Sequence, residues 1–116
     1  MSSWISSTLI FVTEVDASIR FYVDLLGFTL NMRFEDDGRA LVAGVSRGDG
    51  CALLLTSQWP EKAGTGVIYT ALPTEEFDLF LSEIEKKGVI TKGGLWGKPL
   101  TIVEDPDGNQ LYFPNP

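Results

Sequence analysis

The sequence contains no histidine among its 116 residues, so no histidine can act as a general base, complete a catalytic triad or bind a metal. Its single cysteine, Cys51, excludes an internal disulfide and a cysteine-cluster zinc site. Basic residues are also scarce, because 9 lysines and arginines against 16 acidic residues give a formal net charge of −7. An acidic chain without a basic run is a poor partner for nucleic acid or a membrane. No apolar run approaches the length of a membrane span.

The length fits one domain with a single core. Hydrophobic residues make up 44% of the chain and charged residues 22%, which is typical of a globular protein. The opening MSSWISSTLIFV has neither a basic region nor a cleavage site of small residues. We therefore expect no signal peptide and a cytoplasmic location.

The first half of the sequence predicts one helix among several strands. Apolar residues at positions i, i+3, i+4 and i+7 indicate a helix over about 17–26, with Asp16 as its N-cap and Gly27 at its end. Short apolar runs rich in β-branched and aromatic residues predict strands at 6–14, 28–34, 40–46 and 51–56. The polar turns 35–39 and 46–50 separate the last three strands.

The second half repeats this order after a loop at 57–66 that contains Pro and Gly. Thr74 is the expected N-cap of a second helix with the same apolar spacing, and Gly88 is expected to end it. Strands are predicted at 67–72, 89–92, 98–104 and 110–114. The sequence Asp-Pro-Asp-Gly-Asn at 105–109 predicts a turn between the last two.

Each half thus has the order strand, helix, three strands. We predict an α+β fold of duplicated βαβββ modules, at about 6–57 and 66–115, in a single domain. The modules would form a curved mixed sheet around a cleft, with the helices outside. Neither half is large enough to make a good core alone, so the halves must pack together within the chain or with a second copy.

Two motifs resemble those of a known superfamily. FYVDLLGF at 21–28 and LWGKPLTIVEDPDGNQLYF at 95–113 are similar to the two signatures of the vicinal oxygen chelate superfamily. That superfamily includes glyoxalases, dioxygenases and bleomycin resistance proteins. Their order and separation cover nearly the whole chain, so the resemblance supports the duplicated fold.

The resemblance also implies where metal ligands would lie in the enzymes of this superfamily. Those positions fall near Ser7, in the strand 51–56, and at Tyr69 and Tyr112. None of these offers a His, Gln or Glu, and Gln110 is the one nearby donor. A divalent metal needs three or four convergent ligands, so we expect no metal, no cofactor and no catalytic residue.

What remains resembles the bleomycin-resistance branch, whose members are dimers that sequester a cationic aromatic antibiotic in clefts between subunits. The resemblance implies the ligand-binding residues Met32 (or its neighbour Asn31), Phe34, Thr56, Tyr69, Trp96 and Tyr112. It also implies an acidic rim of Glu35, Asp36 and Asp37 that would attract a cation. We predict a homodimer that binds a small amphipathic molecule and acts on neither nucleic acid nor membrane.

Alternatives remain open at this point. Tyr69 and Trp96 fit ordinary strand and hairpin packing about as well as ligand stacking, and packing is the favoured role of Trp59. The three acidic residues also fit a solvated turn. For the whole protein, the alternative is a superfamily enzyme of the glyoxalase, lyase or dioxygenase kind acting on a small organic substrate. A protein-interaction scaffold whose cleft is filled by its own side chains is a third option.

Overall fold

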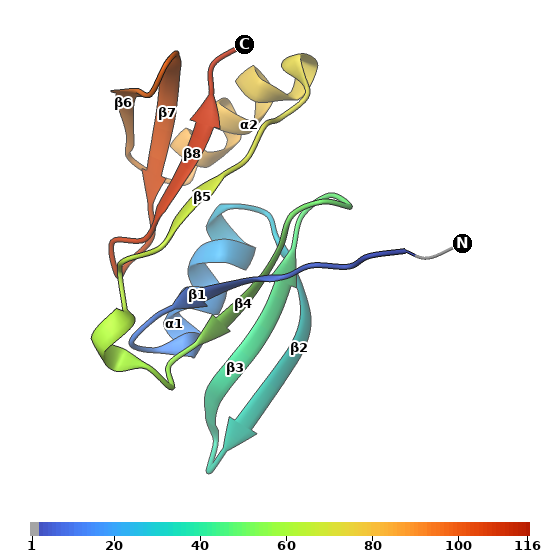
Figure 1. Ribbon diagram of the computed structural model, residues 1–116, viewed down its shortest axis with the longest axis vertical. Helices are drawn as coiled ribbons and strands as arrows, with labels where there is room; N and C mark the ends of the chain where they lie inside the picture. The colour runs from blue at the N-terminus through green and yellow to red at the C-terminus, as the bar shows by residue number, and fades with distance from the viewer. Residues whose placement is uncertain (1–2) are drawn as a thin grey trace.

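The computed structural model describes residues 3–116 and contains two four-stranded mixed sheets with two helical segments (Figure 1). The first sheet has the order β1-β4-β3-β2, and the second has the equivalent order β5-β8-β7-β6. In each sheet the first and last strands in sequence pair in parallel and the other neighbours are antiparallel. The structure confirms the predicted α+β fold with a duplicated strand order. The strands are β1 (Thr8–Phe11), β2 (Thr29–Asp36), β3 (Arg39–Ser46), β4 (Ala52–Thr56), β5 (Val67–Tyr69), β6 (Thr91–Leu95), β7 (Pro99–Glu104) and β8 (Gln110–Pro114).

The first helix lies where the apolar spacing predicted it, but it changes type along its length. α1 (Val15–Ile19) continues into the π-helical turn η1 (Arg20–Leu25), in which the Leu26 amide donates to the Phe21 carbonyl. The prediction of Asp16 as N-cap was wrong, because Asp16 lies inside the helix, and its carboxylate accepts hydrogen bonds from Arg33 and the Ala40 amide.

The second helix, α2 (Thr74–Lys86), begins one residue earlier than expected. Pro73 occupies the N-cap position, so the prediction of Thr74 as the cap was wrong. Gly88 has a φ of 86° and follows the helix as predicted. The connecting loop also contains a single 3₁₀ turn, η2 (Pro60–Lys62). No helix among residues 3–116 is long and apolar enough to cross a membrane.

One continuous hydrophobic core joins the two sheets. Phe80 of α2 packs against Phe113 of β8 with ring centroids 5.1 Å apart, and Tyr22 of η1 packs against Phe28 at 5.5 Å. Because neither sheet closes a core alone, burying these faces together holds the two halves in one unit. The fully buried members from both halves include Ile10, Val12, Tyr22, Leu26, Leu55, Ile84, Val103 and Leu111.

A hydrogen-bonded joint connects the two halves at one end of the core. Inside it, one oxygen of the buried Asp105 carboxylate accepts the Tyr22 hydroxyl and the Asn109 side-chain amide, each at 2.9 Å. The same Asn109 amide nitrogen also donates to the Phe11 carbonyl at 3.0 Å. Burial, reinforced by the neighbouring Asp105 charge, raises the pKa of Tyr22 far above its ordinary value, so the hydroxyl stays protonated and donates. The two motifs of the family resemblance thus meet here.

The rest of the joint ties the loop after β1 to the turn before β8. The Asp107 carboxylate accepts from the Thr13 amide and, at 2.8 Å, from its hydroxyl. Gly64 has a φ of +82°, and a Cβ atom there would lie 2.2 Å from the Asp107 carbonyl oxygen. Only glycine therefore fits where the loop between β4 and β5 passes the turn before β8.

Candidate functional site

The second sheet leaves one apolar face open to solvent. Register places Tyr69 of β5, Tyr112 of β8 and Ile102 of β7 side by side across three strands. Trp96, in the turn between β6 and β7, meets Tyr69 with ring centroids 5.7 Å apart and ring planes at 71°. Edge-to-face contact of this kind leaves ring surface free for a ligand. Tyr69 is 49% exposed and Trp96 is 67% exposed.

These side chains line a groove of about 400 Å³, and every residue lining it belongs to the second sheet or its β6–β7 turn. A volume of this size suits a small organic molecule. The sequence predicted Tyr69, Trp96 and Tyr112 for the site, and the structure brings them together. It adds four apolar residues that the sequence analysis missed. The added members are Val67, Leu95, Leu100 and Ile102.

A polar row borders the aromatic part of the same face. Glu104 pairs with Gln110 across β7 and β8, and Gln110 accepts a hydrogen bond from the Tyr112 hydroxyl at 3.2 Å. Glu104 also forms an ion pair with Lys92 of β6. The open face therefore combines flat aromatic surface with a carboxylate whose counterion is an exposed lysine.

The first sheet also leaves an apolar face open. Register aligns Leu9, Leu54, Gly44 and Met32 across its four strands, on the face opposite the buried row that contains Ile10 and Leu55. Met32 lies across Gly44, since a Cβ atom on that glycine would come within 3.1 Å of the Met32 Cγ.

Three of the predicted ligand residues belong to this face, and two of them are accessible to solvent. Met32 is 46% exposed and Phe34 is 59% exposed. Thr56 is in the row of Phe34 but is buried, and its hydroxyl accepts the Gln58 amide. Trp59 is half exposed and packs edge-on against Phe11, with ring centroids 5.8 Å apart.

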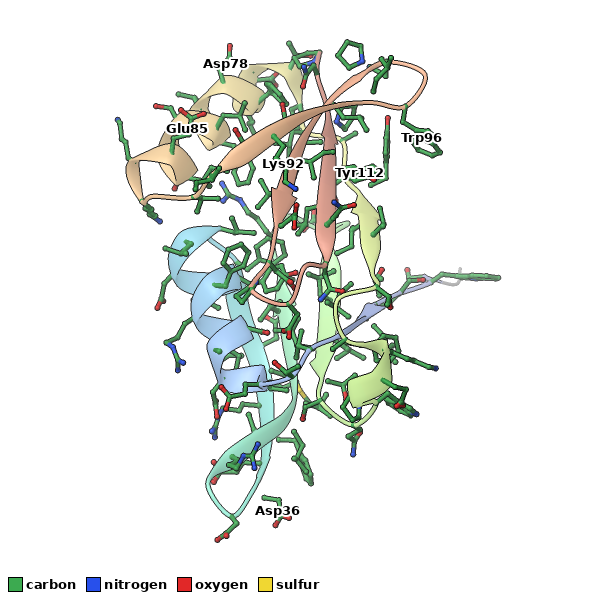
Figure 2. The ribbon with its side chains drawn as sticks, turned by 90° about the vertical axis from the view of Figure 1, so that its left-hand side faces the viewer. Asp36, Asp78, Glu85, Lys92, Trp96 and Tyr112 are labelled. Carbon is green, nitrogen blue, oxygen red and sulfur yellow. The ribbon has the colours of Figure 1, made fainter. Side chains whose placement is uncertain are left out.

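The predicted acidic rim lies at the tip of the β2–β3 hairpin. Asp37, with a φ of 53°, and Gly38 form the tight turn, and Glu35 pairs with Arg33. Figure 2 shows Asp36 at the opposite end of the molecule from Trp96 and Tyr112. Within one chain the acidic residues and the aromatic groove are therefore separate.

The residues at the superfamily's metal positions do not form a donor set. Tyr69 and Tyr112 are neighbours across β5 and β8, where phenol rings stand in place of the usual ligands. Among residues 3–116, no three His, Cys, Asp or Glu side chains lie close enough together to hold an ion. At Tyr69 and Tyr112 the chain has aromatic rings on the open face of the second sheet.

Comparison with known proteins identifies the family. The family model of the Glyoxalase/Bleomycin resistance protein/Dioxygenase superfamily matches residues 4–113. The chain therefore belongs to this superfamily, as its two motifs predicted. A relative from Synechocystis described as a probable lactoylglutathione lyase is 32% identical over 117 residues, which covers 90% of this chain and 88% of the relative.

Solved structures share the fold at lower identity. The bleomycin-binding protein of Streptomyces verticillus, solved with copper(II)-bleomycin, has a TM-score of 0.75 at 23% identity and covers 100% of this chain and 99% of its own. The lactoylglutathione lyase of Agrobacterium tumefaciens also has a TM-score of 0.75, at 18% identity, covering 98% of this chain and 94% of its own. The same fold therefore carries both a binding protein and an enzyme.

Proposed function

We propose that this protein binds and sequesters a small amphipathic, cationic aromatic compound without transforming it. The observation that carries the proposal is the open aromatic groove of Tyr69, Trp96 and Tyr112 on the second sheet. Flat rings of this kind bind a planar ligand by stacking and apolar burial. The bleomycin-binding structure of the same fold supports this class of ligand.

The cleft in this proposal is completed by a second copy of the chain. Among residues 3–116, the walls of the groove come from the second sheet and its β6–β7 turn, and the open face of the first sheet carries exposed Leu9, Met32 and Phe34. Exposed apolar patches of this kind mark interaction surfaces. In a twofold dimer, the first-sheet face of each copy would cover the second-sheet groove of the other and form two equivalent clefts.

Charge supports a cationic ligand. The chain has a net charge of −7, which favours a cation over an anion at its surface. In the proposed dimer, Glu35, Asp36 and Asp37 of the hairpin tip would rim the cleft. Carboxylates around a cleft attract a cation and raise its rate of association. We also propose that the protein acts in the cytoplasm.

Binding can be tested by titrating the protein with metal-free bleomycin, with the planar cation 9-aminoacridine and with its uncharged relative acridone, using calorimetry. We expect bleomycin or aminoacridine to bind with one site per chain. Trp96→Ala should weaken binding at least about tenfold through lost stacking. The control is Leu79→Ala, because Leu79 is an exposed apolar residue of α2 that does not line the groove. Failure of all three compounds to bind would contradict the proposal.

The alternative is a lyase-like enzyme of the same superfamily, and the Synechocystis relative favours it. In that case a Tyr69 or Tyr112 hydroxyl would serve as acid or base on a substrate held in the groove. The test is turnover of the hemithioacetal of methylglyoxal and glutathione, with chelator and separately with added Ni²⁺, Zn²⁺ or Mn²⁺. Turnover that is lost in Tyr69→Phe or Tyr112→Phe would support the enzyme, whereas no turnover under any condition would favour sequestration.

A further inference from the structure

A second cavity opens between the two halves of the chain, at the other end of β1 from the joint. Its outer part has a volume of about 620 Å³ and lies between the β3–β4 turn and the segment that joins β5 to α2. A smaller inner chamber of about 40 Å³ continues from it. The two parts share five lining residues, so they form one crevice. The shared residues are Arg47, Cys51, Thr70, Leu72 and Glu76.

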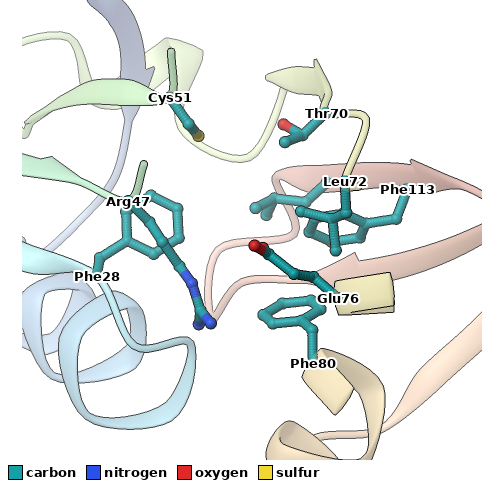
Figure 3. Close-up of a pocket in the computed structure, with 9 residues that line it drawn as sticks. Phe28, Arg47, Cys51, Thr70, Leu72, Glu76, Phe80 and Phe113 are labelled. Carbon is teal, nitrogen blue, oxygen red and sulfur yellow. The ribbon is translucent and has the colours of Figure 1, made fainter. Parts of the chain in front are cut away.

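The inner chamber is apolar. Figure 3 shows Phe28 on one side and Leu72, Phe80 and Phe113 on the other, and Leu111 also lines it. A cavity needs about 10–15 Å³ to hold one water molecule, so the 40 Å³ of the inner chamber accommodates about three groups of that size. The chamber therefore has room for a compact aliphatic group of about three or four carbons. Its polar lining residues, Arg47, Thr70 and Glu76, are the ones it shares with the outer part.

Arg47, the one basic residue that lines the crevice within the described range 3–116, already has partners. Arg47 donates to the Leu26 carbonyl and lies 3.5 Å from a Glu83 carboxylate oxygen. Its guanidinium also sits 5.0 Å from the centre of the Phe80 ring. Its positive charge is thus balanced by Glu83, and Arg47 serves as a wall of the chamber.

The acidic residues of the crevice are not engaged in this way. Glu76 of α2 and Asp49 of the β3–β4 turn both line it. Within residues 3–116, neither carboxylate takes part in a hydrogen bond or an ion pair. In Figure 3 the Glu76 carboxylate points into the space between Arg47 and Leu72. Among residues 3–116, the charged groups of the crevice that have no partner are therefore these two carboxylates.

We propose that this crevice is a binding site for a small primary amine that carries a compact aliphatic group. The aliphatic group enters the inner chamber, and the ammonium remains in the outer part, facing Glu76 and Asp49. This site differs from the aromatic groove: Tyr69 borders both the groove and the outer part, but the inner chamber shares no residue with the groove. The proposal does not depend on the sequestration function.

The single cysteine allows a test that reports on this site alone. Cys51 lines both parts of the crevice and none of the aromatic groove. We expect n-butylammonium chloride to slow the modification of Cys51 by methyl methanethiosulfonate, in a saturable way, at constant ionic strength. 1-Butanol should protect more weakly, because it lacks the charge, and sodium butyrate should not protect. Equal protection by butyrate, or no protection by butylammonium, would overturn the proposal.

Substitutions in the crevice test whether the protection of Cys51 arises from binding there. Glu76→Gln should raise the butylammonium concentration needed for half-protection by up to about fivefold, the range of a partly exposed ion pair. Glu75→Gln is the matched control, because Glu75 is an exposed neighbour on the same helix that does not line the crevice. Leu72→Phe should fill the chamber and abolish protection. An equal loss of protection in Glu75→Gln and Glu76→Gln would show that butylammonium responds only to the overall charge of the protein, and would contradict the proposed site.

Discussion

The Tyr22 hydroxyl and the Asp105 carboxylate are buried together, although 83 positions separate them in the sequence. Tyr22 lies in the helix predicted at 17–26, and Asp105 lies in the turn predicted at 105–109. Each has a local role there, since Tyr22 is fully buried and Asp105 accepts the amides of Asp107 and Asn109. The hydrogen bond between the two residues adds a further role, which is to hold one half of the chain against the other.

Tyr22→Phe should lower the free energy of unfolding by about 1–3 kcal/mol, because it removes a donor from a buried carboxylate. Urea denaturation followed by far-UV circular dichroism measures the change. The control is Tyr69→Phe, which removes an exposed hydroxyl and should cost less than about 0.5 kcal/mol. Equal stability of Tyr22→Phe and the unmodified protein would show that the joint contributes little.

Gly64 and Gly48 provide a second test at the residue scale. Both have positive φ, but an added Cβ meets the Asp107 carbonyl at Gly64 and has nothing within 4 Å at Gly48. Gly48→Ala should therefore cost about 1–2 kcal/mol from backbone strain alone. Gly64→Ala should cost at least about 1 kcal/mol more, because backbone must also move. Thermal unfolding of the two variants compares them, and equal losses would contradict the close approach.

At the scale of single elements, α1 is attached to the β2–β3 hairpin through Asp16. Arg33 donates to both oxygens of its carboxylate, and the Ala40 amide donates to one of them. The hydrogen bonds from Arg33 are the largest of the effects that hold the pKa of Asp16 below its ordinary value of 3.8. The folded state thus favours the ionised carboxylate.

This attachment should be visible in the acid range. Since the pKa of Asp16 is lower in the folded state, its contribution to stability is present above about pH 4 and is lost as the pH falls through the folded value. Asp16→Asn should therefore cause a small loss of stability at pH 7 and a weaker dependence of stability on pH below 4. Urea unfolding at several pH values measures both. An unchanged acid dependence would contradict the assignment.

Element positions could be predicted because their signals are local. The apolar spacing that includes Tyr22 and Leu26, and the glycines Gly27 and Gly88, lie within the segments that they define. The helix caps could not be predicted in this way, because Arg33, the partner that occupies Asp16, is 17 residues away. The π-helical turn has no local pattern that distinguishes it from an α-helix.

The candidate site was predictable only in part for the same reason. The resemblance to the superfamily indicated Tyr69 and Tyr112. Val67 and Ile102 join the groove through the register of β5, β8 and β7, which a single sequence does not specify. The crevice between the two halves could not be predicted, because Cys51 and Glu76 come together only when the halves pack against each other.

At the scale of the whole molecule, the two open apolar faces lie on different sheets of the same chain. A dimer that pairs them should form in solution with a dissociation constant in the micromolar range or below. Phe34→Asp would place a charge on the first-sheet face and should raise that constant by at least about tenfold. Sedimentation velocity measures the change.

Phe34 is exposed and makes no core contact, so the Phe34→Asp chain should remain folded, which circular dichroism can verify. The control is Leu79→Asp, an exposed apolar position on α2 away from both faces. A monomer at all concentrations for the unmodified protein would contradict the shared cleft.

The long separations within the joint also have a consequence for how the chain acquires its structure. Thr13 and Asp107 are 94 positions apart, and Asn109 and the carbonyl of Phe11 are 98 apart. Contacts that close such long loops form late and slow the search for the native state. During synthesis, Tyr22 has no hydrogen-bond partner until the segment around Asp105 has left the ribosome. In that interval the apolar surface of the first half is exposed, which favours aggregation.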